Sequence, residues 1–189
     1  MFPQTSPMTL VDIGGNTGRF SKAFLLRFPE AKAVIADLPV EVDALPRRPE
    51  LAEVCARLSG VAIDWLTPDE LTDRPQTEGA DLYWMSQFLD CFSEAEAVSI
   101  LTRTRRAMAQ NSRLAVLEPI VDEQRHRAAE LSLAATSLYF TVLANGNSKF
   151  FNGAELRRIF AAAGFAIESE HPDLGVSHTL FILRAENAS

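Results

Sequence analysis

The chain has 189 residues, a length that suits one domain with a single well-filled core. Its formal net charge is −7 and its isoelectric point is near 5.0, so neither a nucleic-acid backbone nor an anionic membrane is expected as a partner. Cys55 and Cys91 lack C-x-x-C spacing, which predicts free thiols in a reducing compartment. The longest uncharged apolar stretch, Leu131 to Ala144, is too short to cross a bilayer, and no signal peptide is recognised. These features predict a cytoplasmic protein.

Strand-like runs alternate with helical patterns along the chain, an order typical of a doubly wound sheet. The last two runs are too close together for a crossover helix between them, so they should pair antiparallel. The predicted fold class is α/β, with a doubly wound, mostly parallel, seven-stranded Rossmann-like sheet and an antiparallel last strand. The seven strands are expected at 9–13, 32–37, 60–65, 80–86, 112–118, 165–170 and 177–184.

Three helices are predicted from apolar spacing and from capping patterns. The first follows the first strand and ends before Pro29. The second begins with a capping box at 93–96, and the third begins with a similar pattern at 152–155 and ends at Gly164. A longer helix, at 123–144, has apolar side chains on more than one face, and we expect core packing to account for most of them.

The segment Val11-Asp12-Ile13-Gly14-Gly15-Asn16-Thr17-Gly18 is the most informative part of the sequence. Here an apolar run breaks into a Gly-rich turn and opens a helix. This arrangement places backbone N–H groups at the carboxyl end of a strand, where open α/β sheets bind nucleoside ligands. A dinucleotide fingerprint read from Gly14 requires glycine where the chain has Asn16 and Arg19, which argues against a nicotinamide-dependent dehydrogenase.

The acid-x-G-x-x-x-G form of this turn resembles motif I of the class I S-adenosylmethionine-dependent methyltransferases. The resemblance implies that the turn wraps the methionine part of S-adenosylmethionine, whose product is S-adenosylhomocysteine. It also implies that Asp37, which ends the next apolar run, binds the ribose hydroxyls, and that Leu38 belongs to the cofactor site. The turn residues expected to contact the cofactor are Asp12, Gly14, Gly15, Asn16 and Gly18.

The order of motifs over residues 8–184 resembles the catalytic domain of the caffeate and hydroxyindole type O-methyltransferases, in a bacterial branch. Asp37-Leu38-Pro39 is similar to the D-L-P of that family, and 63–66 is similar to its G-D-M-F segment. The second similarity implies that Asp64 contacts the adenine amino group and that Trp65 packs on the adenine ring. Residues 81–93 align without gaps with the family's D-x-x-x-x-K-x-x-L-H-D-W-S.

The family's catalytic residues are only partly present. Glu118 falls at the position of the first orienting glutamate, but Asp90 replaces the histidine and Phe150 replaces the second glutamate. Ser86 stands where the family has lysine, and we assign it to the cofactor site. An ordinary Asp is less basic than His by roughly 2.6 pKa units, or roughly 3.5 kcal/mol, so Asp90 is a poor base unless burial beside Glu118 raises its pKa.

Several roles for Asp90 stay open at this point. It could act as the base or position the acceptor, it could only flank a helix, or it could be a relic of lost activity. His178, at the start of the last predicted strand, is an alternative base. The resemblance implies that the 123–144 helix forms the acceptor wall, with Tyr139, Phe140 and Asn145 lining the substrate cavity. The histidines and acids show no ligand spacing, so no metal is expected.

The resemblance also bears on partners. Full-length members of the family carry an N-terminal dimerisation domain that residues 1–189 lack. We therefore expect 1–189 to be one S-adenosylmethionine-binding catalytic domain that works as a homodimer or with a partner domain.

The first functional hypothesis is transfer of a methyl group from S-adenosylmethionine to an oxygen of a small aromatic or conjugated metabolite. Residues 84–92 also resemble a bacterial branch of polyketide-type pigment pathways, which implies secondary metabolism and an acceptor delivered on a carrier protein. The alternative is a degenerate domain that binds the cofactor but acts as a non-catalytic scaffold or partner subunit. A dehydrogenase is the third hypothesis.

Overall fold

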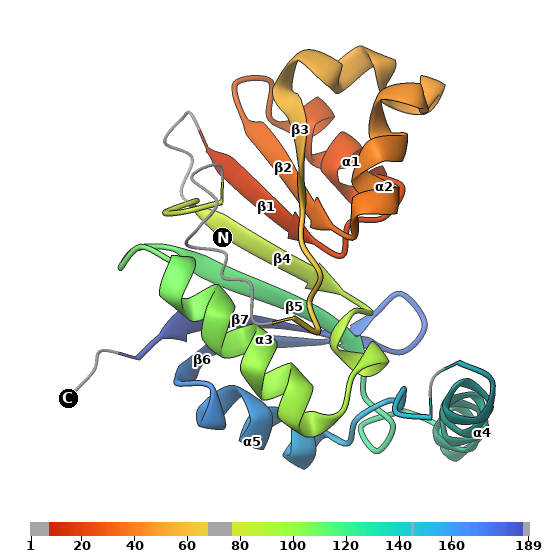
Figure 1. Ribbon diagram of the computed structural model, residues 1–189. Helices are drawn as coiled ribbons and strands as arrows, with labels where there is room; N and C mark the ends of the chain where they lie inside the picture. Colours follow the sequence, from red (N-terminus) through yellow and green to blue (C-terminus); the bar gives the residue numbers. More distant parts are fainter. Residues whose placement is uncertain (1–7, 68–76, 145, 187–189) are drawn as a thin grey trace. The chain divides into compact units, whose positions relative to one another are not determined.

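The computed structural model describes residues 8–67, 77–144 and 146–186 (Figure 1). It contains a seven-stranded sheet in the order β3-β2-β1-β4-β5-β7-β6. Strand β1 pairs parallel with β2 and β4, β2 pairs parallel with β3, and the last two strands pair antiparallel. The predicted α/β fold class is therefore confirmed. The chain divides into two compact units, which are Met1–Met85 with Arg106–Leu114 and Ser86–Arg105 with Ala115–Ser189.

The first unit is built on parallel strands. These are β1 (Thr9–Ile13), β2 (Lys32–Asp37), β3 (Leu58–Ala62) and all but the last residue of β4 (Leu82–Ser86). Apart from their first residues, β1 and β2 are buried throughout, as expected for parallel strands covered on both faces. The helix α1 (Arg19–Arg27) contacts β1 and β2, and α2 (Pro39–Ala44) contacts β2 and β3 (Figure 1).

Short helical turns and aromatic pairs complete the packing of this unit. Two 3₁₀ segments, η1 (Leu45–Arg47) and η2 (Pro49–Arg57), follow α2, and their Leu45 and Leu51 pack against Ile35. The rings of Phe20 and Trp84 stack with centroids 3.9 Å apart and planes 3° from parallel, which joins α1 to β4.

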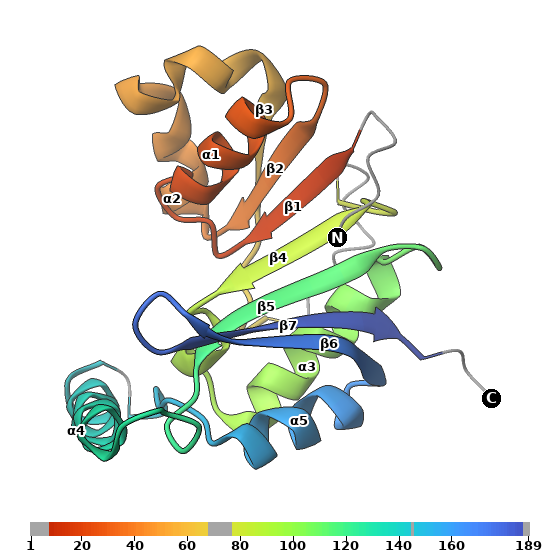
Figure 2. The ribbon, with the colours of Figure 1, turned by 180° about the vertical axis from the view of Figure 1, so that it is seen from behind.

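The second unit contains an antiparallel hairpin of β6 (Phe165–Leu174) and β7 (His178–Ala185), seen from behind in Figure 2. It also holds most of β5 (Arg113–Pro119) and of α3 (Glu94–Ala107). The helix α5 (Gly153–Ala162) contacts β6. Both predicted capping boxes form, because Glu96 accepts a hydrogen bond from the Ser93 N–H (2.8 Å) and α5 begins with a capping box at Asn152.

The predicted third strand, 60–65, is shifted from the observed β3 at 58–62. Pairing between β2 and β3 ends where Ala62 lies opposite Asp37. Beyond that point Asp64 begins a turn, because its Oδ1 accepts the Leu66 N–H (3.0 Å) and its carbonyl oxygen accepts the Thr67 hydroxyl (2.9 Å). The apolar run continues past the sheet, so the sequence pattern alone placed the strand too late.

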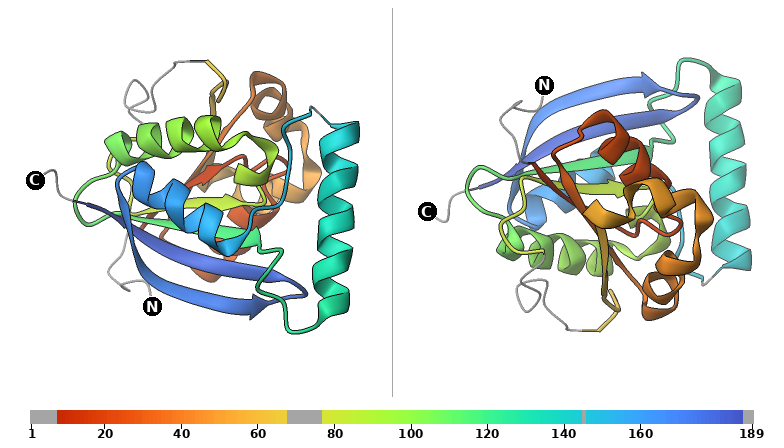
Figure 3. Two further views of the ribbon diagram at one scale, coloured as in Figure 1. Left: turned by 90° about the horizontal axis from the view of Figure 1, so that it is seen from below. Right: turned by 90° about the horizontal axis from the view of Figure 1, so that it is seen from above.

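The helix α4 (Arg127–Leu143) contains no buried residue, so the expectation that core packing accounts for its apolar side chains is wrong. Leu138 is 66% exposed and Val142 is 72% exposed. Figure 3 shows α4 standing apart from α3 and α5 of the same unit. Among the described residues, no helix is long and apolar enough to cross a membrane.

Candidate functional site

The Gly-rich turn joins β1 to α1 in a conformation that few residues adopt. Gly14 and Gly18 have φ of 67° and 75°, in the left-handed region that favours glycine, and Asn16 has φ of 45°. The Gly14 N–H donates to the carbonyl oxygen of Ala36 in β2 (2.9 Å), and the Gly18 N–H donates to that of Gly15 (2.8 Å). The turn is therefore held by the neighbouring strand and by itself.

Asp37, the last residue of β2, is attached to this turn and is 8% exposed. Its Oδ2 accepts the Asn16 N–H and its Oδ1 accepts the Leu38 N–H, both at 2.7 Å. An ionised carboxylate has about four acceptor sites on its two oxygens, so each oxygen can accept a further hydrogen bond. The structure thus brings the predicted Asn16, Asp37 and Leu38 together around one carboxylate.

Asp12 lies beneath the turn. It is 2% exposed, its Oδ2 accepts the Ser21 hydroxyl (2.6 Å), and burial raises the pKa of its carboxyl to about 6. A Cβ added to Gly15 would lie 2.8 Å from Asp12 Cγ, so this carboxyl group fills the space directly under Gly15. Asp12 braces the turn against α1 through Ser21.

The segment 63–65 also reaches the end of β2. The Ile63 N–H donates to the carbonyl oxygen of Asp37 (2.8 Å), which fixes Asp64 and Trp65 within two residues of that contact. Asp64 is exposed, whereas Trp65 is 4% exposed and belongs to the core. Ser86, the remaining predicted cofactor residue, is half-buried at the start of the second unit.

In the second unit, Glu118 of β5 holds the turn that carries Asp90. Its Oε1 accepts the N–H groups of Phe88 (3.0 Å) and Leu89 (2.9 Å), just before and at the start of the short 3₁₀ segment η4 (Leu89–Cys91). Glu118 is 1% exposed, and its buried Oε2 makes no hydrogen bond to any described residue. Burial, together with the charge of Asp90, raises the pKa of Glu118 well above its ordinary value.

Asp90 is fixed in η4 and is 9% exposed. The Lys149 N–H donates to its carbonyl oxygen (2.9 Å), and the Cys91 thiol lies 3.5 Å from its Oδ1. Burial raises the pKa of the Asp90 carboxyl to about 6, because the charged form loses its hydration. That value is close to the roughly 6.5 of an ordinary histidine, so burial largely compensates for the replacement of histidine by aspartate.

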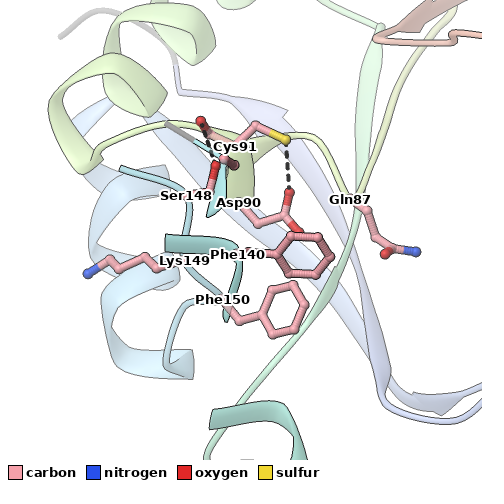
Figure 4. Close-up of a pocket in the computed structure, with 8 residues that line it drawn as sticks. Gln87, Asp90, Cys91, Phe140, Ser148, Lys149 and Phe150 are labelled. Carbon is pink, nitrogen blue, oxygen red and sulfur yellow. Dashed lines mark hydrogen bonds between the residues drawn. The ribbon is translucent and has the colours of Figure 1, made fainter. Parts of the chain in front are cut away.

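A cavity of about 320 Å³ opens beside Asp90 (Figure 4). In this view the Asp90 carboxyl group and the rings of Phe140 and Phe150 point into one space, while the Lys149 side chain extends away. The two ring centroids are 5.9 Å apart. The 148–150 segment is tied to α4, since the Phe150 N–H donates to the Ser137 hydroxyl (2.9 Å). The lining residues are Gln87, Asp90, Cys91, Phe140, Ala144, Ser148, Lys149 and Phe150.

The other two residues predicted to contact the acceptor are not among the described residues that line this cavity. Tyr139 is 61% exposed and does not line this cavity, although its ring is 5.9 Å from that of Phe140. Asn145 lies outside the described residues. Sequence reasoning missed Gln87, Cys91, Ser148 and Lys149 as lining residues. Cys91 directly follows Asp90 and Gln87 precedes it by three residues, and this closeness in sequence is the only signal that could have indicated these two.

His178 does not line the cavity either. Its Nε2 is buried without a hydrogen bond to the described residues, and burial lowers the pKa of its imidazole. Within the described ranges, no cluster of three or more His, Cys, Asp or Glu side chains is arranged to hold a metal ion.

Comparison with known proteins places this chain among longer relatives. It is 31% identical over 161 residues to the O-methyltransferase SfmM3 of Streptomyces lavendulae, covering 84% of this chain and 46% of that protein. It is 28% identical to the 3-amino-4-hydroxybenzoate 4-O-methyltransferase of Streptomyces cremeus, covering 85% of this chain and 41% of that protein. The chain thus spans less than half the length of these curated relatives.

A solved structure shares the fold. The crystal structure of the O-methyltransferase NcsB1 from neocarzinostatin biosynthesis, in complex with S-adenosyl-L-homocysteine and 1,4-dihydroxy-2-naphthoic acid, superposes with a TM-score of 0.75. It is 24% identical, with 94% of this chain and 49% of that chain covered, so the likeness concerns the fold. A family model described as an O-methyltransferase domain matches residues 4–166. This match covers most of the sequence, and the chain therefore belongs to the O-methyltransferase domain family.

Proposed function

We propose that this chain is the catalytic domain of an S-adenosylmethionine-dependent O-methyltransferase that methylates an oxygen of a small aromatic or conjugated metabolite. The observation that carries the proposal is the Asp37 carboxylate, bound by the Asn16 N–H of the Gly-rich turn and able to accept two further hydrogen bonds. The name of the Streptomyces cremeus relative, a 3-amino-4-hydroxybenzoate 4-O-methyltransferase, supports an aromatic acceptor. We further propose a role in secondary metabolism.

The residues present fit the cofactor. The two oxygens of Asp37 suit the two neighbouring hydroxyls of a ribose, and the Gly14 to Gly18 turn exposes backbone suited to an amino acid tail. Asp64 is exposed and directly follows Ile63, whose N–H donates to the carbonyl oxygen of Asp37, and in this proposal it accepts a hydrogen bond from the adenine amino group. When bound, S-adenosylmethionine supplies an electrophilic methyl group, and no metal is required for its transfer.

The second unit supplies the acceptor side of the reaction. Methyl transfer is an in-line displacement, so holding the acceptor in near-attack geometry provides much of the rate. In this proposal the rings of Phe140 and Phe150 flank the acceptor, and Asp90 takes the proton from its hydroxyl. Glu118 positions Asp90 by holding the N–H groups of the turn that carries it. Tyr139 and Asn145 stay predicted acceptor contacts.

Further proposals concern partners and location. We propose that the domain acts as a homodimer or with a partner domain, and that its acceptor can be delivered on a carrier protein. The exposed apolar side chains of α4 support pairing with another chain or domain. The free cysteines, Cys55 and Cys91, suit a reducing compartment and hence a cytoplasmic location.

Titration calorimetry with S-adenosylmethionine tests the cofactor site. The Asp37→Asn variant should bind about 10- to 100-fold more weakly, because a hydrogen bond to a charged group contributes roughly 1.5–3 kcal/mol. Asp43→Asn, which removes an exposed carboxylate from α2, is the matched control and should leave Kd unchanged. Undetectable binding to the wild-type chain at millimolar cofactor would contradict the proposal.

A methyl-transfer assay with labelled cofactor across phenols, carboxylic acids and amines tests catalysis. With a working phenol, Asp90→Asn should lower kcat by about 10²- to 10⁴-fold, the usual contribution of a general base. Full turnover in Asp90→Asn would show that Asp90 is not the base. Cofactor binding without transfer to any acceptor would instead favour the non-catalytic scaffold.

A further inference from the structure

The acceptor cavity is acidic and has no charged group that compensates for its acids among the residues described. Asp90 lines the cavity, and Glu118 lies close enough for the charge of Asp90 to raise its pKa. Lys149 is the cationic residue among the lining side chains, but its Nζ is paired with Glu94 (3.4 Å) and Glu155 (3.1 Å). Figure 4 shows this side chain leading away from Asp90. The groups that act on the Asp90 carboxyl include no cation from the described residues.

The aromatic rings strengthen this electrostatic preference. Phe140 and Phe150 line the same cavity with ring centroids 5.9 Å apart. The face of an aromatic ring is electron-rich, so it attracts a cation or a polarised N–H group. It does not attract an anion. A carboxylate flanked by two such rings is an environment that suits a nitrogen group.

One oxygen of the carboxylate is open to a ligand. The Cys91 thiol lies 3.5 Å from Oδ1, and no side chain of a described residue donates a hydrogen bond to Oδ2. An acceptor that brings its own donors would satisfy this oxygen. An acceptor that brings a carboxylate would place two like charges in a desolvated pocket, which is costly.

We propose that this cavity selects hydroxyaromatic acceptors that carry an amino or ammonium nitrogen beside the hydroxyl, with both groups facing the Asp90 carboxylate, and excludes those that carry a carboxylate in place of the nitrogen. The inference rests on the proposed function for the identity of the reaction, but it is a statement about binding. Asp90 recognises the nitrogen through charge and hydrogen bonding. Phe140 and Phe150 contact the aromatic ring of the acceptor and the charge of its nitrogen.

Three phenols that differ in the group beside the hydroxyl test the selectivity: ortho-aminophenol, catechol and salicylate. Each is titrated into the wild-type chain without cofactor, by calorimetry or by ligand-observed NMR. We expect the aminophenol to bind at least about tenfold more tightly than salicylate, with catechol between them. In Asp90→Asn, which keeps the side-chain shape but removes the charge, the three affinities should converge to within about threefold.

Two further variants make the test specific. Asp173→Asn removes the same formal charge from the exposed end of β6, where Asp173 pairs with Arg125, and should leave the tenfold preference intact. Phe140→Leu should weaken binding of the cationic ortho-hydroxybenzylamine several-fold more than binding of catechol, because it removes one ring face.

The outcomes separate this inference from the proposed function. Salicylate binding as tightly as the aminophenol in the wild type would overturn the selectivity, and so would a preference that survives Asp90→Asn. These binding measurements do not depend on methyl transfer, so they can be interpreted even if the chain is catalytically inactive. Conversely, methyl transfer to all three ligands with equal KM would overturn the selectivity while leaving the proposed function standing.

Discussion

The missing side chain at Gly15 gives Asp12 its place beneath the Gly-rich turn. A Cβ at this position would meet Asp12 Oδ2 at 2.9 Å and Ile35 Cγ2 at 3.1 Å, both inside ordinary contact distance. We expect Gly15→Ala to lower the free energy of unfolding by about 1–3 kcal/mol, the usual cost of overpacking, and to weaken S-adenosylmethionine binding. Denaturant unfolding and calorimetry measure the two effects.

Gly175→Ala is the control for that variant. Gly175 has φ of 60° in an exposed hairpin turn, and no described atom lies within 4 Å of the place that a Cβ would occupy. The substitution costs backbone strain of roughly 1–2 kcal/mol but should leave the cofactor affinity unchanged. Wild-type cofactor affinity in Gly15→Ala would show that the shape of the turn does not govern binding.

Asp90 shows what a sequence can and cannot reveal about a proposed catalytic residue. The motif order points to Asp90 and Glu118, but an unperturbed aspartate is too weak a base for a phenol. Its basicity depends on burial, which raises the pKa to about 6, and burial depends on segments as distant in sequence as 148–150. Local sequence contains no information about that dielectric environment.

At the scale of elements, the exposure of α4 predicts how substitutions in it affect stability. Leu138 of α4 is 66% exposed, whereas Leu101 of α3 is fully buried. Leu138→Ala should therefore change the free energy of unfolding by less than about 0.5 kcal/mol, whereas Leu101→Ala should lower it by about 2–5 kcal/mol. Chemical denaturation monitored by circular dichroism measures both. A loss of several kcal/mol in Leu138→Ala would mean that this face of α4 is covered in solution.

The elements differ in how well the sequence predicts them. The first two strands match their predicted limits, because β1 and β2 are continuous buried runs that end at a glycine turn and at Asp37. The limits of β3 were missed because Ile63 and Trp65 are buried without belonging to the sheet. The exposure of α4 was not predicted. Apolar spacing indicates that a helix has an apolar face, but it does not indicate whether this face packs in the core of the same chain.

For the whole molecule, buried acids predict a dependence of stability on pH. Asp12 and Asp90 have folded-state pKa values of about 6, and the pKa of Glu118 is also raised. The folded chain therefore binds more protons than the unfolded chain between the unfolded pKa near 4 and the folded pKa. Stability from these groups is present at low pH and is lost as pH rises through about 6.

We expect the free energy of unfolding to fall between pH 5.5 and pH 7.5 by roughly 1 kcal/mol for each of Asp12 and Asp90. Asp12→Asn should remove its share of this slope, while Asp43→Asn, at an exposed position, should not. Urea titrations at the two pH values provide the measurement. Stability that rises over this interval would contradict the assignment of raised pKa values to the buried acids.

The chain's two indole rings both belong to the unit that holds the Gly-rich turn. Trp84 stacks on Phe20 of the helix that follows the turn, and Trp65 lies two residues beyond the contact that Ile63 makes with Asp37. Intrinsic fluorescence excited where only tryptophan absorbs therefore originates from this unit alone. Tryptophan emission can therefore report, without a label, on cofactor binding at the proposed site in this unit. Ligands that enter the cavity beside Asp90 in the other unit meet no tryptophan there.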